Sequence, residues 1–256
     1  MSVEIPGDDG YFDERRAATY DDDAGIFDPA VVDPAVVFLA ELASGGNALE
    51  FGIGTGRIAL PLSRRGVAVH GVDLSGAMIE RLKAKQNGEN IGVTLGDFSM
   101  TRVDGSFSLV YLVFNTIMNL TTQSAQVACF RNAAAHLKPG GHFVVEVMVP
   151  QIQRLSKDET LLAYELSDTH WGVDEYDVLL QGLISHHANI VDGNIELHSI
   201  PFRYVWPAEL DLMAQLAGLT LVERRTSWDQ EQFTAASRSH VSVWAQPAKH
   251  ENTSQV

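Results

Sequence analysis

The chain has 256 residues, of which 45% are hydrophobic, and a formal net charge of −15 from 33 acidic and 18 basic residues. This length and apolar content suffice for one folded domain with an insertion. The acidic excess works against any partner with a phosphate backbone, so we expect no nucleic acid partner.

The sequence also lacks the patterns of several other protein classes. Its single cysteine, Cys129, excludes a disulfide within the chain. No apolar run is long enough to span a bilayer and no basic-then-apolar leader opens the sequence, so we expect no membrane partner and a cytoplasmic location. The histidines lack the spacing of metal ligands, so we expect no metal site.

The first segment is acidic and aromatic, with Tyr11 and Phe12 followed by Tyr20 and three aspartates. An acidic run of this kind is typical of a solvated arm. Asp33 is a good helix N-cap and Pro34 fits a first turn, so we predict that a helix begins at this pair.

A glycine-rich turn at residues 52–56 follows an apolar strand that begins at Ala48, and Asp73 ends the next strand. In this arrangement a nucleoside binds against bare backbone while its ribose hydroxyls face the carboxylate. The dinucleotide-binding pattern requires a third glycine where this chain has Arg57. Glu50 places a carboxylate beside the turn, which would repel a pyrophosphate and suits a cationic ligand. The sequence therefore predicts a site for a positively charged nucleoside.

Strands and helices alternate through the centre of the chain, which indicates a parallel sheet with helices on both faces. Apolar runs at residues 91–95 and 111–114 predict strands, and Asp97 and Phe98 follow the first of them. A helical repeat of apolar residues then ends at the turn 138–141, before a fifth strand.

From residue 150 the pattern changes to that of an antiparallel unit. The apolar content predicts three long strands at residues 161–167, 177–190 and 195–206. The dipeptide Asp192-Gly193 is a strong hairpin signal between the last two. Pro207 then begins a helix that Gly218 ends, and two closing strands are predicted at residues 219–223 and 240–245.

The pattern E-x-G-x-G-T-G at residues 50–56, with Asp73 at a strand end, resembles motif I and the following acidic loop of class I S-adenosylmethionine-dependent methyltransferases. Residues 96–98 are similar to the end of the family's third strand, and residues 137–146 to its turn into strand five. Residues 114–120 resemble the loop after strand four in sugar amine N-methyltransferases. The motifs occur in the order that the family requires.

The resemblance is specific over residues 45–150 and continues more loosely to residue 246. It implies an α/β fold: a Rossmann-like, doubly wound, mostly parallel sheet with an antiparallel last strand, plus an antiparallel β insertion after strand five. We divide the chain into an N-terminal helical lid (1–44), a methyltransferase core (45–149 and 207–247), the insertion (150–206) and a polar tail (248–256).

The resemblance implies an enzyme that moves a methyl group from S-adenosylmethionine to the nitrogen or oxygen of a small-molecule acceptor by in-line displacement. A noncatalytic S-adenosylmethionine-binding module is an alternative, because it would share every cofactor motif. A nicotinamide-dependent oxidoreductase is a second, which Arg57 and Glu50 disfavour. The cofactor-binding residues that the motifs imply are Tyr20, Glu50, Gly52, Gly54, Thr55, Gly56, Arg57, Asp73, Leu74, Met78, Asp97, Phe98, Phe114 and Asn115.

The catalytic candidates are Tyr20, Asn119 and His186, with His170 and His187 as further residues near the strand ends. Residues 17–21 resemble a leading A-x-x-Y-D element that folds over the cofactor in the family, which places Tyr20 at the site. Asn119 occupies a position where sugar amine N-methyltransferases can hold an ionisable residue, but asparagine cannot abstract a proton. His186 and His187 are adjacent on a strand, so at most one of them faces the pocket.

We expect the insertion to lie over the open edge of the site and to line the acceptor pocket. The same strands would alternatively form an oligomer interface and make the protein a homodimer. Trp171, Tyr204 and Trp206 fit either the wall of an apolar or cationic pocket or ordinary core packing.

Overall fold

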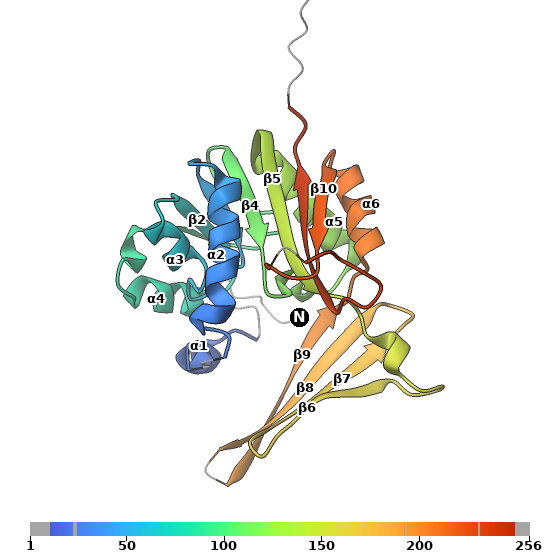
Figure 1. The fold of residues 1–256 in the computed structure, drawn as a ribbon. Coiled ribbons are helices and arrows are strands. Elements are labelled where there is room, and N and C mark those ends of the chain that lie inside the picture. The colour runs from blue at the N-terminus through green and yellow to red at the C-terminus, as the bar shows by residue number, and fades with distance from the viewer. Residues whose placement is uncertain (1–10, 23–24, 192, 230, 249–256) are drawn as a thin grey trace, which may run out of the picture.

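The computed structural model describes residues 11–22, 25–191, 193–229 and 231–248, and its core is a seven-stranded sheet of order β10-β11-β5-β4-β1-β2-β3 (Figure 1). Strands β1 to β5 run parallel to one another, and β11 is antiparallel to both β5 and β10. This confirms the predicted doubly wound sheet with an antiparallel last strand. The strands are β1 (Ala48–Phe51), β2 (Val69–Asp73), β3 (Gly92–Leu95), β4 (Phe107–Leu112), β5 (Leu137–Met148), β10 (Thr220–Arg225) and β11 (Ser239–Ala245).

Helices cover both faces of this sheet, as the alternating pattern predicts (Figure 1). Phe130 and Trp244 belong to the hydrophobic core on one face, and Leu39 and Leu62 to the core on the other. In the part of the chain that the structure describes, no helix is long and apolar enough to cross a membrane. The helices are α1 (Glu14–Tyr20), α2 (Pro29–Ala43), α3 (Ala59–Arg64), α4 (Gly76–Ala84), α5 (Gln123–His136) and α6 (Pro207–Leu216), with short 3-10 helices η1 (Gly88–Asn90), η2 (Thr116–Asn119) and η3 (Ile152–Arg154).

Helix α2 begins earlier than predicted, so the start at Asp33 and Pro34 was wrong. The N-cap is Asp28, whose side chain accepts a 2.8 Å hydrogen bond from the Ala30 backbone, and Pro29 opens the first turn. Pro34 lies inside the helix. The chain contains two Asp-Pro pairs, each with the same start signal, and the earlier pair begins the helix.

The insertion is a four-stranded antiparallel sheet, β6 (Leu161–Leu166), β7 (His170–Asp177), β8 (Gly182–Val191) and β9 (Asn194–Arg203). The prediction of three strands was therefore wrong, because it missed β7. Figure 1 shows the sheet extending away from the core, with β9 nearest to it. Asp192 of the predicted hairpin turn lies outside the described residues, and Val191 and Asn194 pair across it.

A buried polar cluster joins this second sheet to the core. The Arg203 guanidinium, at the end of β9, donates to Gln126 of α5, to Gln181 and, at 2.7 Å, to Glu209 of α6. Gln126 in turn donates to the backbone carbonyls of Ile117 and Arg203. The cluster thereby fixes β9 against the loop that follows β4.

The predicted division into lid, core, insertion and tail stays a prediction. Residues 1–10 of the predicted lid lie outside the described residues. So does the predicted tail, apart from Ala248.

Candidate functional site

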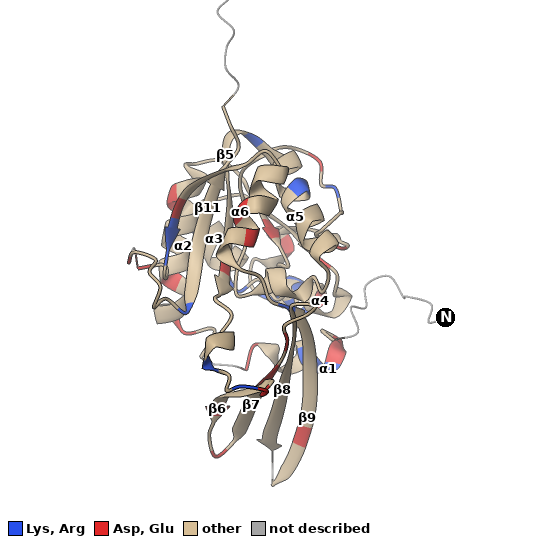
Figure 2. Ribbon diagram, turned by 90° about the vertical axis from the view of Figure 1, so that its right-hand side faces the viewer, with Lys and Arg blue, Asp and Glu red and all other residues tan. Residues whose placement is uncertain are grey.

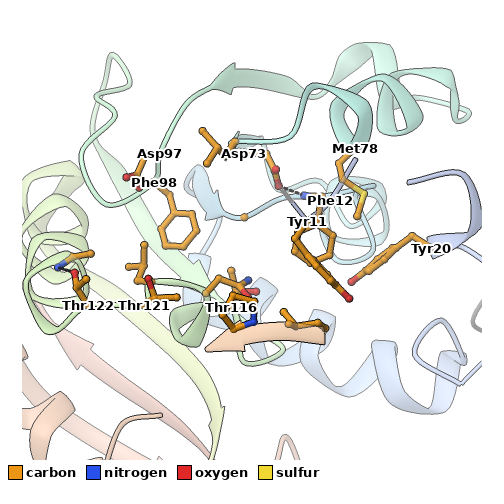
Figure 3. Close-up of a pocket in the computed structure, with 18 residues that line it drawn as sticks. Tyr11, Phe12, Tyr20, Asp73, Met78, Asp97, Phe98, Thr116, Thr121 and Thr122 are labelled. Atoms are coloured by element: carbon orange, nitrogen blue, oxygen red, sulfur yellow. Dashed lines mark hydrogen bonds between the residues drawn. The ribbon is translucent and has the colours of Figure 1, made fainter. Parts of the chain in front are cut away.

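A cavity of about 470 Å³ lies at the carboxyl edge of the parallel strands, where open sheets of this kind bind ligands (Figure 3). Asp97 and Phe98 lie on one side of it, and Tyr11, Phe12 and Tyr20 lie on the other. Of the residues predicted from the sequence, those that line it are Tyr20, Gly52, Gly54, Asp73, Leu74, Met78, Asp97, Phe98 and Asn119.

A second cavity of about 40 Å³ adjoins the glycine turn. It brings together further predicted residues, namely Glu50, Thr55, Arg57 and Phe114, with Tyr20, Gly52 and Gly54 shared between both cavities. Neither cavity, as the structure describes them, is lined by Gly56, Asn115 or His186.

The glycine turn after β1 requires residues without side chains. Gly52, Gly54 and Gly56 all have positive φ angles, of 69°, 53° and 81°. A Cβ atom at Gly52 would lie 2.6 Å from Thr116 Cγ2, and one at Gly56 would lie 2.3 Å from Leu82 Cδ1. At Gly54 a Cβ would meet no atom within 4 Å, so the turn leaves open space beside this residue. Gly56 therefore supports the turn by packing.

Asp73 ties the end of β2 to this turn. One carboxylate oxygen accepts a 2.6 Å hydrogen bond from the Gly54 backbone, and the other accepts a 2.9 Å bond from the Ser75 backbone. Ser75 is also the N-cap of α4. The carboxylate is thus held in one orientation at the wall of the larger cavity.

Glu50 lies deeper in the protein than its predicted role suggests. Its side chain is only 3% exposed and accepts a 2.8 Å hydrogen bond from the Tyr111 hydroxyl. Burial raises the pKa of Glu50 to about 8, although the Tyr111 bond and the Arg57 charge act in the opposite direction. Burial therefore favours the protonated form of this carboxyl group. A positive charge brought beside it would favour ionisation.

The end of β3 supplies a flat apolar wall. The Phe98 ring stacks on Phe51 with centroids 5.8 Å apart, and Asn132 donates to the Phe98 carbonyl at 2.8 Å. The Asp97 carboxylate accepts a 2.7 Å bond from the Ser99 backbone. Both predicted residues are thus fixed at the cavity.

Residues 11–22 pass over the cavity and are bonded to the cofactor-side loops. The Phe12 carbonyl accepts a hydrogen bond from the Ser75 hydroxyl. Asp21, the C-cap of α1, accepts a 2.6 Å bond from Thr55 and pairs with Lys85 at 2.7 Å. Thr55 therefore connects the glycine turn to the segment that carries Tyr20.

The loop after β4 contributes Phe114, Asn115 and Asn119. Phe114 is 41% exposed. The Asn115 side chain accepts a 2.7 Å bond from the Met148 backbone, which directs it to β5. Asn119 ends η2 and lines the larger cavity.

The histidine candidates lie on the insertion. His186 is partly exposed, contacts Ser199 at 2.8 Å and Glu175 at 3.1 Å, and lines neither described cavity, so the structure gives its catalytic role no support. His187 faces the opposite side, stacks on His198 with centroids 4.5 Å apart and contacts His170 at 3.0 Å. Burial, followed by the neighbouring His198 and His170, lowers the pKa of His187 to about 4.

The structure also separates the aromatic candidates. Tyr204 is buried in the core, whereas Trp171 is half exposed. Trp206 packs against the same core as Tyr204. None of the three lines the described cavities.

Several residues at the larger cavity have no role in the sequence-based prediction, namely Phe12, Thr116, Thr121, Thr122, Ile200 and Pro201. Thr122 carries a detectable signal, because it is the N-cap of α5 and its hydroxyl accepts from Ala125. Ile200 and Pro201 reach the cavity only because β9 is anchored beside η2, which no local pattern indicates.

Comparison with known proteins decides the family. Residues 48–141 match the family model described as a methyltransferase domain. The chain is 40% identical to the CcbJ methyltransferase from Streptomyces caelestis, with a TM-score of 0.81 and coverage of 91% of this chain and 96% of that one. The chain belongs to the class I S-adenosylmethionine-dependent methyltransferases. Its cofactor is S-adenosylmethionine, and the predicted family, enzyme class and cofactor are confirmed.

Other relatives agree with this assignment. The methyltransferase is 28% identical to the cypemycin N-terminal methyltransferase of Streptomyces sp, over 92% of this chain and 98% of that protein. It shares the fold of CalS10, an amino pentose methyltransferase from Micromonospora echinaspora whose structure contains the cofactor, at a TM-score of 0.64 and 18% identity, with coverage of 96% and 100%. Neither alternative, a noncatalytic module or a nicotinamide enzyme, receives support from these comparisons.

Proposed function

We propose that this methyltransferase transfers a methyl group to the nitrogen or oxygen of a small-molecule acceptor inside the 470 Å³ cavity. One observation carries the proposal: a single cavity joins the cofactor-side residues Asp73 and Asp97 to Asn119 and to Ile200 of β9. A relative named for N-terminal methylation supports a nitrogen acceptor.

The residues at the strand ends fit the cofactor. Asp73 offers a fixed carboxylate for ribose hydroxyls, Asp97 and Phe98 offer an acceptor and a ring face for adenine, and Leu74 and Met78 offer apolar contacts. The space beside Gly54 leaves the backbone accessible. When bound, S-adenosylmethionine supplies a methyl group on a positively charged sulfur. Glu50 lies at the adjoining small cavity, where a cationic group would lower its pKa and favour its ionised form.

The acceptor side is formed by Tyr11, Tyr20, Thr116 and Asn119. The donor is already activated, so these residues act mainly by holding the nucleophile in line and excluding water. Asn119 orients an acceptor through hydrogen bonds, since an amide cannot remove a proton. Tyr20 is the candidate for contact with the reacting nitrogen or oxygen, and His186 is not part of this proposal.

A labelled-methyl assay tests the proposal. Calorimetry should first show binding of S-adenosylmethionine and of its demethylated product, S-adenosylhomocysteine. A panel of small amines, phenols and carboxylic acids is then screened with methyl-labelled cofactor, with the Asp73→Ala variant as the control. Binding without transfer to any class of acceptor would count against the proposal, as would transfer that Asp73→Ala leaves unchanged.

Nucleic acid and membrane partners are not part of the proposal. The positions of Lys and Arg are scattered along the ribbon in Figure 2 and form no continuous stripe in that view of the described residues. The cytoplasmic location stays a prediction.

A homodimer is proposed through the outer face of the insertion. Leu166, Trp171 and Leu197 lie in one cross-strand row of β6, β7 and β9, and they are 71%, 51% and 78% exposed. An apolar row of this kind is typical of a protein contact. Sedimentation of the wild type and of Leu197→Asp tests this proposal, and a monomeric wild type would exclude it.

A further inference from the structure

Two successive residues in the loop after β4 adopt a conformation that side chains disfavour. Phe114 and Asn115 have φ angles of 57° and 62°, in the left-handed region. Residues other than glycine are uncommon there, and two in succession persist only where surrounding contacts fix them. The loop therefore has an external support.

The support comes from Glu146 of β5. One of its carboxylate oxygens accepts a 2.9 Å hydrogen bond from the Phe114 backbone, and its own carbonyl accepts a 3.2 Å bond from the Asn115 backbone. The Asn115 side chain completes the link by accepting from Met148. These three bonds join the left-handed residues to the end of β5.

The second oxygen of Glu146 is also used. It accepts a 2.8 Å hydrogen bond from the indole nitrogen of Trp228, which lies between β10 and β11. The Trp228 ring packs edge-on against Phe38 of α2, with centroids 5.6 Å apart. The indole that bonds Glu146 is therefore itself fixed on the core. Each of the two carboxylate oxygens of Glu146 accepts a hydrogen bond from one donor.

The result of this support is a fixed aromatic ring at the site. The Phe114 ring lines the small cavity together with Glu50 and Gly52, and the Arg57 guanidinium lies 4.5 Å from its centroid. The same loop continues into Thr116 and Asn119 at the larger cavity.

We propose that Glu146 is a positioning residue for methyl transfer through its bond to Phe114, whereas Trp228 only occupies the second carboxylate oxygen. Glu146 holds Phe114 in its left-handed conformation, so that the ring forms a wall beside the point where the reacting end of the cofactor meets the acceptor. This proposal rests on the proposed function, because it needs the methyl acceptor to lie in the cavity described above.

The test uses the number of acceptor oxygens. In Glu146→Gln the amide has one accepting oxygen, and its NH₂ group must face either the Phe114 N–H or the Trp228 N–H, which are both donors. In the double variant Glu146→Gln with Trp228→Phe, the oxygen can serve Phe114 while the NH₂ group faces a ring without a donor. The single variant should weaken the support, because its one accepting oxygen is shared between two competing donors, and the double variant should regain it.

The expected readout is turnover with unchanged cofactor binding. For the acceptor found in the screen, Glu146→Gln should lower kcat by about tenfold to a hundredfold. Its Kd for S-adenosylhomocysteine should stay within about threefold of the wild-type value, since each lost hydrogen bond lies outside the cofactor contacts. Trp228→Phe and the double variant should both turn over within about threefold of the wild type, because each leaves Phe114 with its acceptor.

Glu146→Asp provides a second variant that keeps the charge and both oxygens but withdraws them by one methylene, and it should also lower kcat. Thermal unfolding shows whether each variant is folded. Wild-type kcat in both Glu146→Gln and Glu146→Asp would overturn the proposal. So would a double variant as slow as Glu146→Gln while Trp228→Phe alone is normal. Failure of the proposed function would instead appear as absent methyl transfer by the wild type.

Discussion

The carboxylate of Asp73 accepts a hydrogen bond of 2.6 Å from the backbone N–H of Gly54, across the gap between β2 and the glycine turn. The same side chain lines the larger cavity. Asp73 therefore shapes the cofactor loop and offers its charge to the ligand at the same time.

We expect Asp73→Ala to weaken binding of S-adenosylmethionine by on the order of 2 to 4 kcal/mol, because charge-assisted hydrogen bonds are lost and the Gly54 amide loses its acceptor. Titration calorimetry measures this directly. Asp104→Ala, at an exposed turn, is the matched control and should bind normally. A Kd close to the wild-type value would refute the role of Asp73.

Glu50→Gln should make the ligand-free protein more stable at alkaline pH. The pKa of Glu50 is about 8 in the folded protein and 4.5 ordinarily, so the folded state keeps a proton that the unfolded state loses. Stability of the wild type therefore falls as pH rises through this window. The advantage of the glutamine variant should grow by about 2 to 3 kcal/mol between pH 6 and pH 8.5.

Urea unfolding at the two pH values tests this expectation. Calorimetry tests a second expectation, on the binding of the cofactor. Glutamine cannot become negative, so Glu50→Gln should bind the cationic cofactor more weakly than the wild type does. An equal stability difference at pH 6 and pH 8.5 would show that Glu50 is not held protonated.

Arg203→Met should destabilise the fold by about 3 to 5 kcal/mol, because it leaves Glu209 and Gln126 without their main partner in a buried cluster. Chemical denaturation gives the free energy of unfolding. Arg15→Met is the matched control, since its ion pair with Glu196 is exposed, and it should change stability by less than about 1 kcal/mol. Equal effects from the two variants would contradict the role assigned to the cluster.

His187→Gln should reduce the sensitivity of the protein to acid. The unfolded chain takes up a proton near the ordinary pKa of 6.5. Folded His187 does so only near 4, because it is partly buried and lies close to His198, His170 and Arg16. Wild-type stability therefore falls as pH drops through this window. After allowance for solvent screening, the variant should lose about 1 kcal/mol less than the wild type between pH 7.5 and pH 5.

Denaturation curves of both proteins at pH 7.5 and pH 5 provide the comparison. His186→Gln serves as the control because His186 lies on the opposite face of the sheet and is only partly buried. Parallel losses in the wild type and His187→Gln would exclude a buried neutral imidazole at this position.

The parallel core could be predicted because its signals are local. Apolar strand runs and the glycine turn are visible in short segments of the sequence, Asp73 is placed by the end of its own strand, and the strand order follows from the family. The insertion was harder. Residues 178–180 were predicted as strand because they are apolar, but they lie exposed in a turn that Asp177 caps. The turn at Ser167, which separates β6 from β7, was missed.

The residues of the site likewise fall into those that could be predicted from local sequence and those that could not. Asp97 and Phe98 directly follow a strand, so their place at its carboxyl end could be predicted. Glu146 and Trp228 are far apart in the chain and meet only through the pairing of β5 and β11. Which of His186 and His187 lies on the face of His198 could not be predicted from the pattern, since the direction of a strand face depends on how the sheet docks.

The single cysteine has a practical consequence for experiments in solution. Cys129 is fully buried in α5, and burial raises the pKa of its thiol well above the ordinary value, so it stays protonated and unreactive toward maleimides. A cysteine introduced at exposed Asp22, beside the segment that passes over the cavity, would be the sole site for a fluorophore. If the methyl-accepting substrate carries a second dye, single-molecule energy transfer then reports the distance between that substrate and the segment during turnover.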